Sequence, residues 1–237
     1  MEDIDAIAVL QDPVRRRLYE YVAAQGREVG RNEAAEAAGV ARNLAAHHLD
    51  KLTEAGLLES GSRRLTGRSG PGAGRPAKVY TRARTERSVS LPARDYRTAA
   101  ELLAEAAEQA RLDEALYAAA RRRGEALRDA GAPCGGLDEV MRTLADRGYE
   151  PHLETDAAEG DAHGEAAGPV VRMRNCPFHA VAERFPPLVC GMNLALLEGL
   201  LGTDGPVRAR MDARPGECCV VVESSGKVVE SSKTNTD

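Results

Sequence analysis

The segment VARNLAAHHLDKLTEAGLL, residues 40–58, constrains the fold more than any other part of the chain. Ala45, Leu49 and Leu52 follow one another at intervals of four and three residues, which predicts a helix with one buried face, and Gly56 is expected to end it. A shorter helix fits RNEAAEAAG immediately before this segment, and its glycine provides a turn. Two short helices joined by a glycine turn, with polar groups on the outer face of the second, are typical of a helix-turn-helix.

The outer face of the predicted second helix and its flanks carry polar or charged residues: Arg42, Asn43, His47, Asp50, Lys51 and Glu54. We expect Arg42, Asn43 and His47 to contact bases. We also expect His47 and His48 to be solvated or to face phosphates rather than to bind a metal. Ala41 stands where a serine or threonine often caps such a helix, so the first turn is expected to depend on other groups.

The segments on either side of this motif complete a winged domain. Upstream, Asp12 and Pro13 are expected to start a helix. Downstream, LLES and KVYTRA predict two strands joined by a glycine-rich loop. Between residues 60 and 87, one acidic residue, Glu86, stands against eight basic ones: Arg63, Arg64, Arg68, Arg75, Lys78, Arg82, Arg84 and Arg87. Because phosphates attract arginines while base edges meet a helix, this basic hairpin predicts binding to duplex DNA.

The stretches GVARNLAAHHLDKLTEAGLL and GRPAKVYTRA carry a family resemblance. They are similar to winged helix-turn-helix regulators of the arsenic-repressor and deoxyribose-repressor type, and the resemblance covers about residues 10–84. It implies a domain that binds double-stranded DNA, with the wing arginines on phosphates. The DNA-binding candidates are Arg42, Asn43, His47, Lys51, Arg63, Arg64, Arg68 and Arg75.

A long helical segment follows Pro92, since ARDYRTAAELLAEAAEQARLDEALYAAARRRGEALRDAG consists largely of strong helix formers. It carries a coiled-coil-like seam at intervals of four and three: Tyr96, Ala100, Leu103, Ala107, Ala110, Glu114 and Tyr117. The seam favours a homodimer, whose recognition helices would lie about 34 Å apart on a palindromic operator. Packing of this helix against the chain's own domains is the alternative.

The carboxy-terminal part has a different pattern. LDEVMRTLADRGYEPHLE predicts a helix that leads into a strand, PVVRMRN a strand, FPPLVCGMNLALLEGLL a helix, and VRARMDARPGECCVVVE two strands around a turn. This order predicts an α+β domain with an antiparallel sheet. The whole chain is therefore expected to be α+β, in four parts: a winged helix-turn-helix at 1–90, connecting and dimerisation helices at 91–131, a sensor domain at 132–224 and a disordered tail at 225–237.

The cysteines of this part suggest a metal centre without matching a standard motif. Cys176, Cys190 and Cys218 are separated by 13 and 27 residues, a spacing of neither zinc fingers nor ferredoxins. Each is expected at the end of a strand, near the start of a helix or after a turn, where distant thiols converge and a helix start favours the thiolate. Phe178 and Phe185 would supply either a low-dielectric shell for such a centre or ordinary core packing.

A second resemblance is carried by NCPFHAVAERFPPLVCGMNLALLEGLL and ARPGECC. These stretches resemble the carboxy-terminal domain of the SufR family, the iron–sulfur-binding repressors of iron–sulfur cluster assembly (suf) operons. With the winged helix, the resemblance spans nearly the whole chain. It implies a homodimer, a cluster of the 4Fe-4S type in each subunit, and DNA binding that depends on the cluster.

This resemblance carries over three metal ligands, Cys176, Cys190 and Cys218. The fourth ligand stays open, and the candidates are Cys219, His179, Asp204 and Cys134. Cys219 is expected to pack beneath the sheet, because neighbouring residues on a strand point to opposite faces. His179 is expected to be a hydrogen-bond partner rather than a ligand.

Taken together, these features predict a transcriptional repressor that senses iron–sulfur status. The net charge of −5 does not bear on this, since it averages over a local basic face. A zinc, copper or small-molecule sensor on the same DNA-binding domain is the alternative. We do not expect an enzyme, because we find no serine elbow, Walker loop or persuasive Cys–His–acid arrangement.

The sequence also indicates a cellular compartment. The start MEDIDAIAVL lacks the features of a secretion signal, and no apolar run approaches the roughly 20 residues that cross a bilayer. We therefore expect a cytoplasmic protein without membrane contact. Thiols stay mostly reduced there, so the five cysteines are expected to bind metal, sense redox state or be buried rather than form disulfides.

Overall fold

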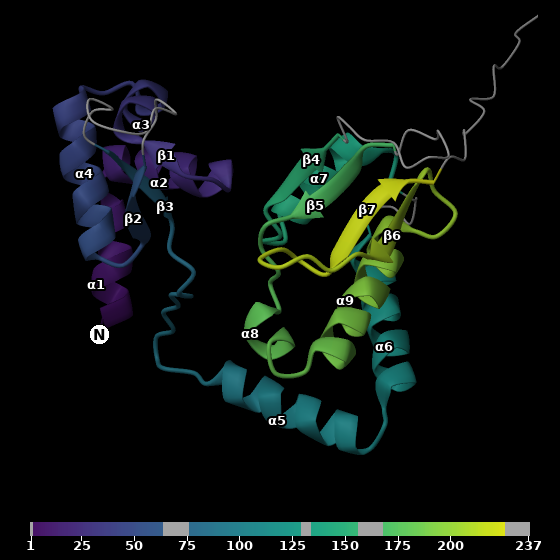
Figure 1. Cartoon of the computed structure of the whole chain (residues 1–237). Coiled ribbons are helices and arrows are strands. Elements are labelled where there is room, and N and C mark those ends of the chain that lie inside the picture. The colour runs from purple at the N-terminus through teal and green to yellow at the C-terminus, as the bar shows by residue number, and fades with distance from the viewer. Residues whose placement is uncertain (1, 64–75, 129–133, 156–167, 226–237) are drawn as a thin grey trace, which may run out of the picture. The chain divides into compact units, whose positions relative to one another are not determined.

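The chain folds into two compact units, Met1–Arg94 and Asp95–Asp237. Their structure, a computed structural model, describes residues 2–63, 76–128, 134–155 and 168–225 (Figure 1). Each unit combines helices with an antiparallel sheet. The fold class is therefore α+β, as predicted. The unit boundary places the helices that follow residue 94 with the carboxy-terminal sheet.

The first unit is a winged helix-turn-helix. Its elements are α1 (Glu2–Ala8), the 3₁₀ turn η1 (Val9–Gln11), α2 (Pro13–Gln25), β1 (Val29–Gly30), α3 (Arg31–Ala38), α4 (Arg42–Glu54), β2 (Leu58–Arg63) and β3 (Ala77–Arg82). Helices α3 and α4 are the predicted helix-turn-helix, and Gly39 joins them in a left-handed conformation with φ +65°. The predicted start of α2 is confirmed, because the Asp12 carboxylate accepts hydrogen bonds from the backbone N–H groups of Val14 and Arg15.

The core of this unit lies among its helices and the first residues of the hairpin. The buried residues are Leu18, Val22, Val29, Ala34, Ala35, Ala38, Ala45, Leu49, Leu52, Leu57, Leu58 and Tyr80. Strand β3 lies between β1 and β2 and pairs antiparallel with both. The pairing from Leu58–Arg82 to Arg63–Ala77 confirms the predicted hairpin beside α4.

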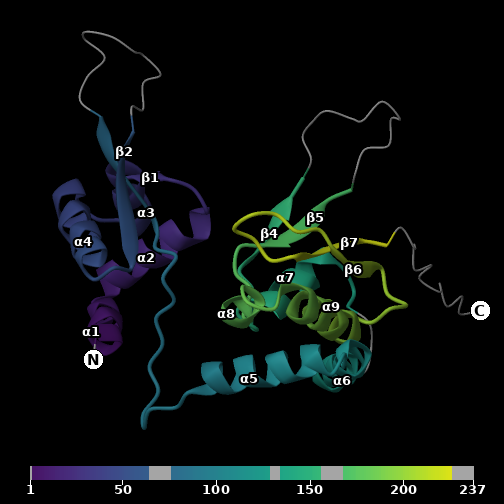
Figure 2. The same ribbon diagram turned by 60° about the horizontal axis from the view of Figure 1, so that its bottom comes forward.

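The second unit contains five helices and four strands among the residues that the structure describes. They are α5 (Tyr96–Gln109), α6 (Asp113–Leu127), α7 (Leu137–Ala145), β4 (Pro151–Glu154), β5 (Val170–Met173), α8 (His179–Ala182), α9 (Pro186–Leu201), β6 (Val207–Met211) and β7 (Val220–Ser224). The strands form an antiparallel sheet in the order β4-β5-β7-β6. Figure 2 shows α7 and α9 on one side of this sheet, with α6 beyond α9.

The main core of the second unit lies between the sheet and these helices. It contains Cys134, Val140, Leu144, Tyr149, Val171, Met173, Leu197, Leu200, Leu201, Val207, Cys218, Val220 and Val222. Val171 and Met173 alternate with Arg172 along β5, so the strand turns its apolar side chains to the helices and its arginine to the other face.

The long helix predicted after Pro92 is two helices. α5 ends at Gln109 and α6 begins at Asp113, and Arg111 between them has φ 53°, which a continuous helix does not allow. The residues of the predicted seam are therefore distributed over α5, α6 and the turn between them. Tyr96 and Leu103 on α5 are 73% and 72% exposed, whereas Tyr117 on α6 packs against α9 and donates a hydrogen bond to the carbonyl of Pro187 at 3.3 Å. Packing within the chain, the alternative interpretation, therefore describes α6 and also the side of α5 that carries Ala104 and Ala107, which packs against Phe185.

Helices α6 and α9 approach so closely that glycine is required at their contact. A Cβ atom on Gly124 would lie 2.1 Å from the carbonyl oxygen of Leu196, and one on Gly199 would lie 2.1 Å from that of Arg121. Arg121 and Glu198 form an ion pair across the same contact. Since real Cβ atoms do not approach backbone oxygens this closely, the two helices can stay together only while both positions lack side chains.

Replacing Gly199 by alanine is expected to push α6 away from α9. Overpacking of this kind costs about 1–3 kcal/mol, and the better helix propensity of alanine offsets roughly 1 kcal/mol of it. Urea unfolding should therefore show a lower midpoint for Gly199→Ala than for the wild type. Gly136→Ala is the matched control, because a Cβ there meets nothing within 4 Å. Equal midpoints for the two variants would contradict the close approach.

Candidate functional site

The recognition helix α4 presents a polar outer face. Arg42, Asn43, His47 and Lys51 are exposed, while Ala45, Leu49 and Leu52 are buried against the rest of the unit. Ala41 precedes the helix without a side-chain hydrogen bond to its first turn, as its residue type predicts. The outer face therefore holds guanidinium, amide, imidazole and ammonium groups, which are the donors and acceptors used on DNA bases and phosphates.

Asp50 was predicted on this outer face, and the prediction is wrong. Its carboxylate turns towards the hairpin and accepts hydrogen bonds from Lys78 Nζ at 2.7 Å and Tyr80 Oη at 2.8 Å. Arg31 Nη2 lies 3.4 Å from both of its oxygens. Burial acts to raise the pKa of Asp50, but the hydrogen bonds from Lys78 and Tyr80 hold it below its ordinary value. Asp50, whose side chain is 41% exposed, therefore ties α4 to β3.

His48 also differs from its prediction as a solvated or phosphate-facing residue. It is 9% exposed, and its buried Nδ1 has no hydrogen-bond partner among the described residues. Burial lowers its pKa because the charged imidazolium is poorly solvated there. His47, one position earlier, is exposed and remains on the outer face.

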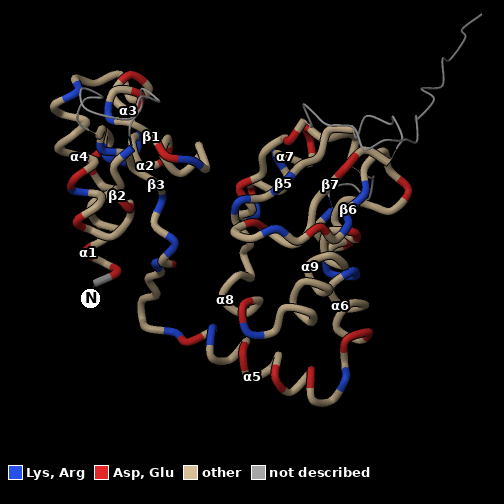
Figure 3. The backbone as a smooth tube through the Cα atoms, viewed as in Figure 1, with Lys and Arg blue, Asp and Glu red and all other residues tan. Residues whose placement is uncertain are grey.

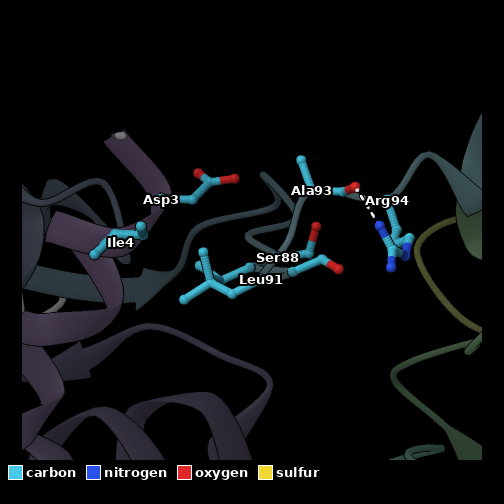
Figure 4. A pocket seen from close by; sticks show the side chains of 8 residues that line it. Asp3, Ile4, Ser88, Leu91, Ala93 and Arg94 are labelled. Atoms are coloured by element: carbon cyan, nitrogen blue, oxygen red, sulfur yellow. Dashed lines mark hydrogen bonds between the residues drawn. The ribbon is translucent and has the colours of Figure 1, made fainter.

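The structure describes only part of the basic hairpin. Arg63 at the end of β2 is exposed, and its Nη1 lies 3.3 Å from Glu28 Oε2. The predicted phosphate contacts Arg64, Arg68 and Arg75 lie outside the described residues. Figure 3 shows further basic positions along β3 and the segment after it. A shallow hollow in the same unit lies between α1 and residues 88–94, lined by residues that include Asp3, Ser88 and Leu91 (Figure 4).

In the second unit, the ends of three elements bring four cysteines together. Cys176 follows β5, Cys190 lies in the second turn of α9, and Cys218 and Cys219 immediately precede β7. The backbone N–H of Cys218 donates to the carbonyl of Met173 at 2.9 Å, which fixes the start of β7 to the end of β5. Residues separated by up to 43 positions (Cys176 to Cys219) are thus neighbours in space.

These thiols form a hydrogen-bonded group centred on Cys218, which is called the thiol cluster below: Cys176, Cys190, Cys218 and Cys219. Cys176 and Cys219 each hydrogen-bond with the Cys218 sulfur, and Cys219 also lies in hydrogen-bonding contact with Cys190. The donation from Cys176 and then from Cys219 lowers the pKa of Cys218. Their bonds to Cys218, and then burial, raise the pKa values of Cys176 and Cys219. Among these thiols, the surroundings favour deprotonation of Cys218 most.

Two further buried side chains complete the surroundings of Cys218. Asn193, on α9 one turn after Cys190, is 0% exposed, and its Nδ2 donates to Cys218 Sγ at 3.4 Å. Tyr149, 2% exposed, donates its hydroxyl hydrogen to Asn193 Oδ1 at 2.5 Å. Burial, followed by the nearby Cys176, Cys218 and Cys219 sulfurs, raises the pKa of Tyr149, so its phenol remains a donor.

A buried arginine holds the turn that carries Cys218. Arg172 is 2% exposed, and its Nε donates to Glu154 Oε2 at 2.6 Å and its Nη2 to Asp212 Oδ2 at 2.5 Å. Glu217, directly before Cys218, lies 3.8 Å from Arg172 Nη1. The guanidinium thus joins β4, β5 and the segment between β6 and β7. A charge buried with several partners in this way fixes that segment in one position.

Cys219 is partly buried and packs against the main core, as expected. The strand alternation that was expected to point its side chain away from that of Cys218 is not present, however. Both residues precede β7, so the alternation of side chains along a strand does not apply to them. The other candidates for a fourth ligand lie elsewhere. His179 is exposed and pairs with Glu183 at 3.2 Å, Asp204 is exposed after α9, and Cys134 hydrogen-bonds with Thr143 and Glu139.

Apolar side chains surround the thiol cluster. Phe178 packs against the main core together with Cys176 and Cys219, and its backbone N–H donates to the Cys176 sulfur. Phe185 belongs to a separate buried group with Ala104, Leu188 and Val189. Phe178 also packs against this group, so it borders both the cysteines and Phe185, while Phe185 fills the contact between α5 and α9.

The donor set is chemically compatible with a metal–sulfur group. Among the described residues, no three His, Cys, Asp or Glu side chains are arranged around one point as a ready site for a metal ion. The four thiols instead form a row, from Cys176 through Cys218 and Cys219 to Cys190. An iron–sulfur cluster takes its thiolates on separate irons and so does not require them to meet at one point. The chemistry of the residues present, four thiols and an amide N–H in an apolar shell, fits such a cluster.

Three of the residues that shape this site were not predicted: Tyr149, Arg172 and Asn193. One of them had a signal in the sequence. Asn193 is an uncharged polar residue in the run PPLVCGMNLALLEGLL, which is apolar except for Asn193 and Glu198, and it lies three positions after Cys190 and so on the same side of the helix. An amide at this position can donate a hydrogen bond to a candidate ligand and so orient it. Tyr149 and Arg172 had no such signal, because their partners are distant in sequence.

Comparison with known proteins supports the first unit's function. The profile of a family described as a helix-turn-helix domain matches residues 10–61, which run from η1 to β2. The chain therefore carries the domain of a DNA-binding transcriptional regulator. No curated protein and no solved structure matches the chain. Among the residues searched, no helix has the length and apolar character needed to cross a membrane.

Burial of His48 makes the stability of the first unit depend on pH. Its folded pKa lies below the unfolded value of about 6.5, so the neutral form is favoured in the folded state. The stability it contributes is complete above that value and is lost as the pH falls through the folded pKa. Between pH 8 and pH 5.5, urea unfolding should show a smaller fall in free energy for His48→Gln than for the wild type. The same fall in both proteins would contradict a neutral buried His48.

Proposed function

We propose that this protein is a transcriptional repressor whose operator binding is set by an iron–sulfur cluster bound at the thiol cluster. The observation that carries the proposal is the row of neighbouring thiols in the second unit, from Cys176 through Cys218 and Cys219 to Cys190. The helix-turn-helix domain supplies the DNA-binding half. The resemblance to the SufR family points to the same combination and suggests control of an iron–sulfur cluster assembly operon.

The thiol cluster has features that favour binding a cluster of the 4Fe-4S type. It provides four sulfur ligands, with Cys219 as the fourth, so no ligand from outside the group is needed. Hydrogen bonds from Cys176 and Cys219 lower the pKa of the Cys218 thiol, and thiolates are the form that binds metal. Phe178 and the main core limit the access of water. When bound, the cluster would supply redox and oxygen sensitivity that side chains alone lack.

Homodimerisation is supported by the outward face of α5. Tyr96, Leu102 and Leu103 are 73%, 61% and 72% exposed on this helix, although such side chains are normally buried. A symmetric pairing of two α5 helices would cover them and place two first units for a palindromic operator.

A path of packed helices connects the thiol cluster with α5. Cys190 lies on α9, and α9 packs against α6 without space for a side chain at Gly124 or Gly199. α6 follows α5 after the turn at Arg111, and α5 begins directly after the first unit. A shift of α9 on ligand loss would therefore move α6, and operator affinity changes of 5- to 150-fold need only about 1–3 kcal/mol of coupling.

Serine substitution of each thiol-cluster cysteine tests the sensing claim. Purified without oxygen, the wild type should contain iron and acid-labile sulfide, and Cys176→Ser, Cys190→Ser, Cys218→Ser and Cys219→Ser should each contain less. Their affinity for a DNA site that the wild type selects from a random pool should equal that of the cluster-free wild type. Cys134→Ser is the matched control and should keep its iron, because its thiol bonds to Thr143 and Glu139 instead.

Two results would contradict this proposal in different ways. Unchanged DNA affinity in all four variants, with the cluster lost, would remove sensing and leave a DNA-binding protein. A colourless wild type with stoichiometric zinc would favour the alternative zinc sensor on the same cysteines.

Arg63→Gln tests the role of the wing. If this exposed arginine contacts a phosphate, its loss should weaken binding to all DNA sequences alike and reduce the slope of log affinity against log salt by about 1. Asn43→Ala on α4 should instead reduce the preference for the selected site. Arg208→Gln, an exposed arginine of the second unit, is the control. An unchanged salt slope for Arg63→Gln would show that Arg63 does not touch DNA.

A further inference from the structure

The buried amide of Asn193 would destabilise the fold around α9 unless it formed specific hydrogen bonds. The helix is apolar along almost its whole length, and Asn193 is completely buried in it. Burying an amide without hydrogen bonds costs several kcal/mol, so its partners explain its place. Those partners are Tyr149 on one side and the sulfur of Cys218 on the other.

The two contacts orient the amide in one direction. The Tyr149 hydroxyl donates to Oδ1 at 2.5 Å, which leaves Nδ2 and its hydrogens facing Cys218 Sγ at 3.4 Å. Tyr149 is itself fixed, because its backbone N–H donates to Leu144 at the end of α7. The donor is therefore aimed by a residue of a different element, and neither side chain can turn away towards water.

We propose that Asn193, aimed by Tyr149, is a positioning residue that sets the metal affinity and the reduction potential of the centre bound through Cys218. This inference rests on the proposed metal-binding function of the thiol cluster and names the residues that tune it. An N–H donor to a ligating sulfur withdraws electron density from it. It thereby stabilises the reduced centre, which carries more negative charge, and raises the reduction potential.

Tyr149 acts only through Asn193. Its hydroxyl bonds to the amide oxygen, and the amide nitrogen bonds to Cys218. Removing the hydroxyl frees the amide to rotate, whereas removing the amide breaks the whole connection. Tyr149→Phe should therefore change the metal affinity and the reduction potential when it is made in the wild type. It should change neither when it is made in a protein that already carries Asn193→Leu.

Two measurements on the full-length protein test the inference. One is the affinity of the metal-free protein for Co²⁺, followed by its sulfur-to-metal absorption. The other is the reduction potential of the reconstituted iron–sulfur protein. Asn193→Leu, similar in shape but without a donor, should weaken Co²⁺ binding by about 10- to 100-fold and shift the potential to a more negative value. Tyr149→Phe should give a smaller change of the same sign, and the double variant should match Asn193→Leu alone.

Val207→Ala controls for loss of stability. Val207 is 1% exposed and belongs to the same core. It pairs with Ser224, whereas Val220, the first residue of β7, pairs with Met211 at the opposite end of β6. Val207 therefore lies about four residues, or about 13 Å, from the start of β7. This variant should unfold more easily and keep the Co²⁺ affinity and potential of the wild type. Equal losses in Val207→Ala and Asn193→Leu, or additive effects of Asn193→Leu and Tyr149→Phe, would overturn the inference.

The outcomes also separate this inference from the proposed function. A wild type that binds Co²⁺ but takes up no cluster would contradict iron–sulfur sensing, while the Co²⁺ affinities would still decide the role of Asn193. A wild type that binds a cluster, with Asn193→Leu unchanged in both measurements, would overturn the role of Asn193 alone. A wild type that binds neither would overturn both.

Discussion

The hydrogen bonds that meet at the sulfur of Cys218 are the interaction on which the second unit depends. Hydrogen bonds from two thiols, Cys176 and Cys219, and from the backbone N–H of Val220 and the amide of Asn193 lower the pKa of the Cys218 thiol, although burial acts to raise it. These four donors come from three places: the segment after β5 (Cys176), the start of β7 (Cys219 and Val220) and α9 (Asn193). The sheet, the helix on its face and the turn between β6 and β7 therefore have to be correctly placed at once, and Arg172 holds that turn.

The same geometry suggests how a change at the cysteines would reach the rest of the molecule. α9 carries both Cys190 and Asn193 on one side and meets α6 through Gly199 on another. Close helix contact with no side chain between the backbones leaves little room for independent movement. A ligand that repositions Cys190 therefore acts on α6 directly, without a flexible intermediate. This coupling is a physical basis for the proposed sensing.

Local patterns in the sequence predicted the first unit well. The spacing of Ala45, Leu49 and Leu52 and the turn at Gly39 define the helix-turn-helix, because both depend on residues close along the chain. The errors arose from contacts between elements. Asp50 turns inward because Lys78 and Tyr80 reach it from β3, some 30 positions away. His48 adjoins the exposed His47 but is buried, and its depth depends on how α2 and α4 pack.

The cysteine site was predictable only in part, because local sequence patterns indicate some of its residues and contacts between elements place the others. Residue type and the ends of predicted elements indicated Cys176, Cys190 and Cys218, but the place of Cys219 depends on where β7 begins. That start is set by the hydrogen bond from Cys218 to Met173 and not by a local motif. The break between α5 and α6 at Arg111 was also hidden, since strong helix formers lie on both sides of it.

The most direct test of the central claim is the position of iron in crystals of the protein grown without oxygen. Anomalous scattering measured at the iron edge should show iron within bonding distance of the sulfurs of Cys176, Cys190, Cys218 and Cys219. Iron bound at any other residues, or sulfurs that remain in contact with one another in protein that carries no iron after reconstitution, would contradict it.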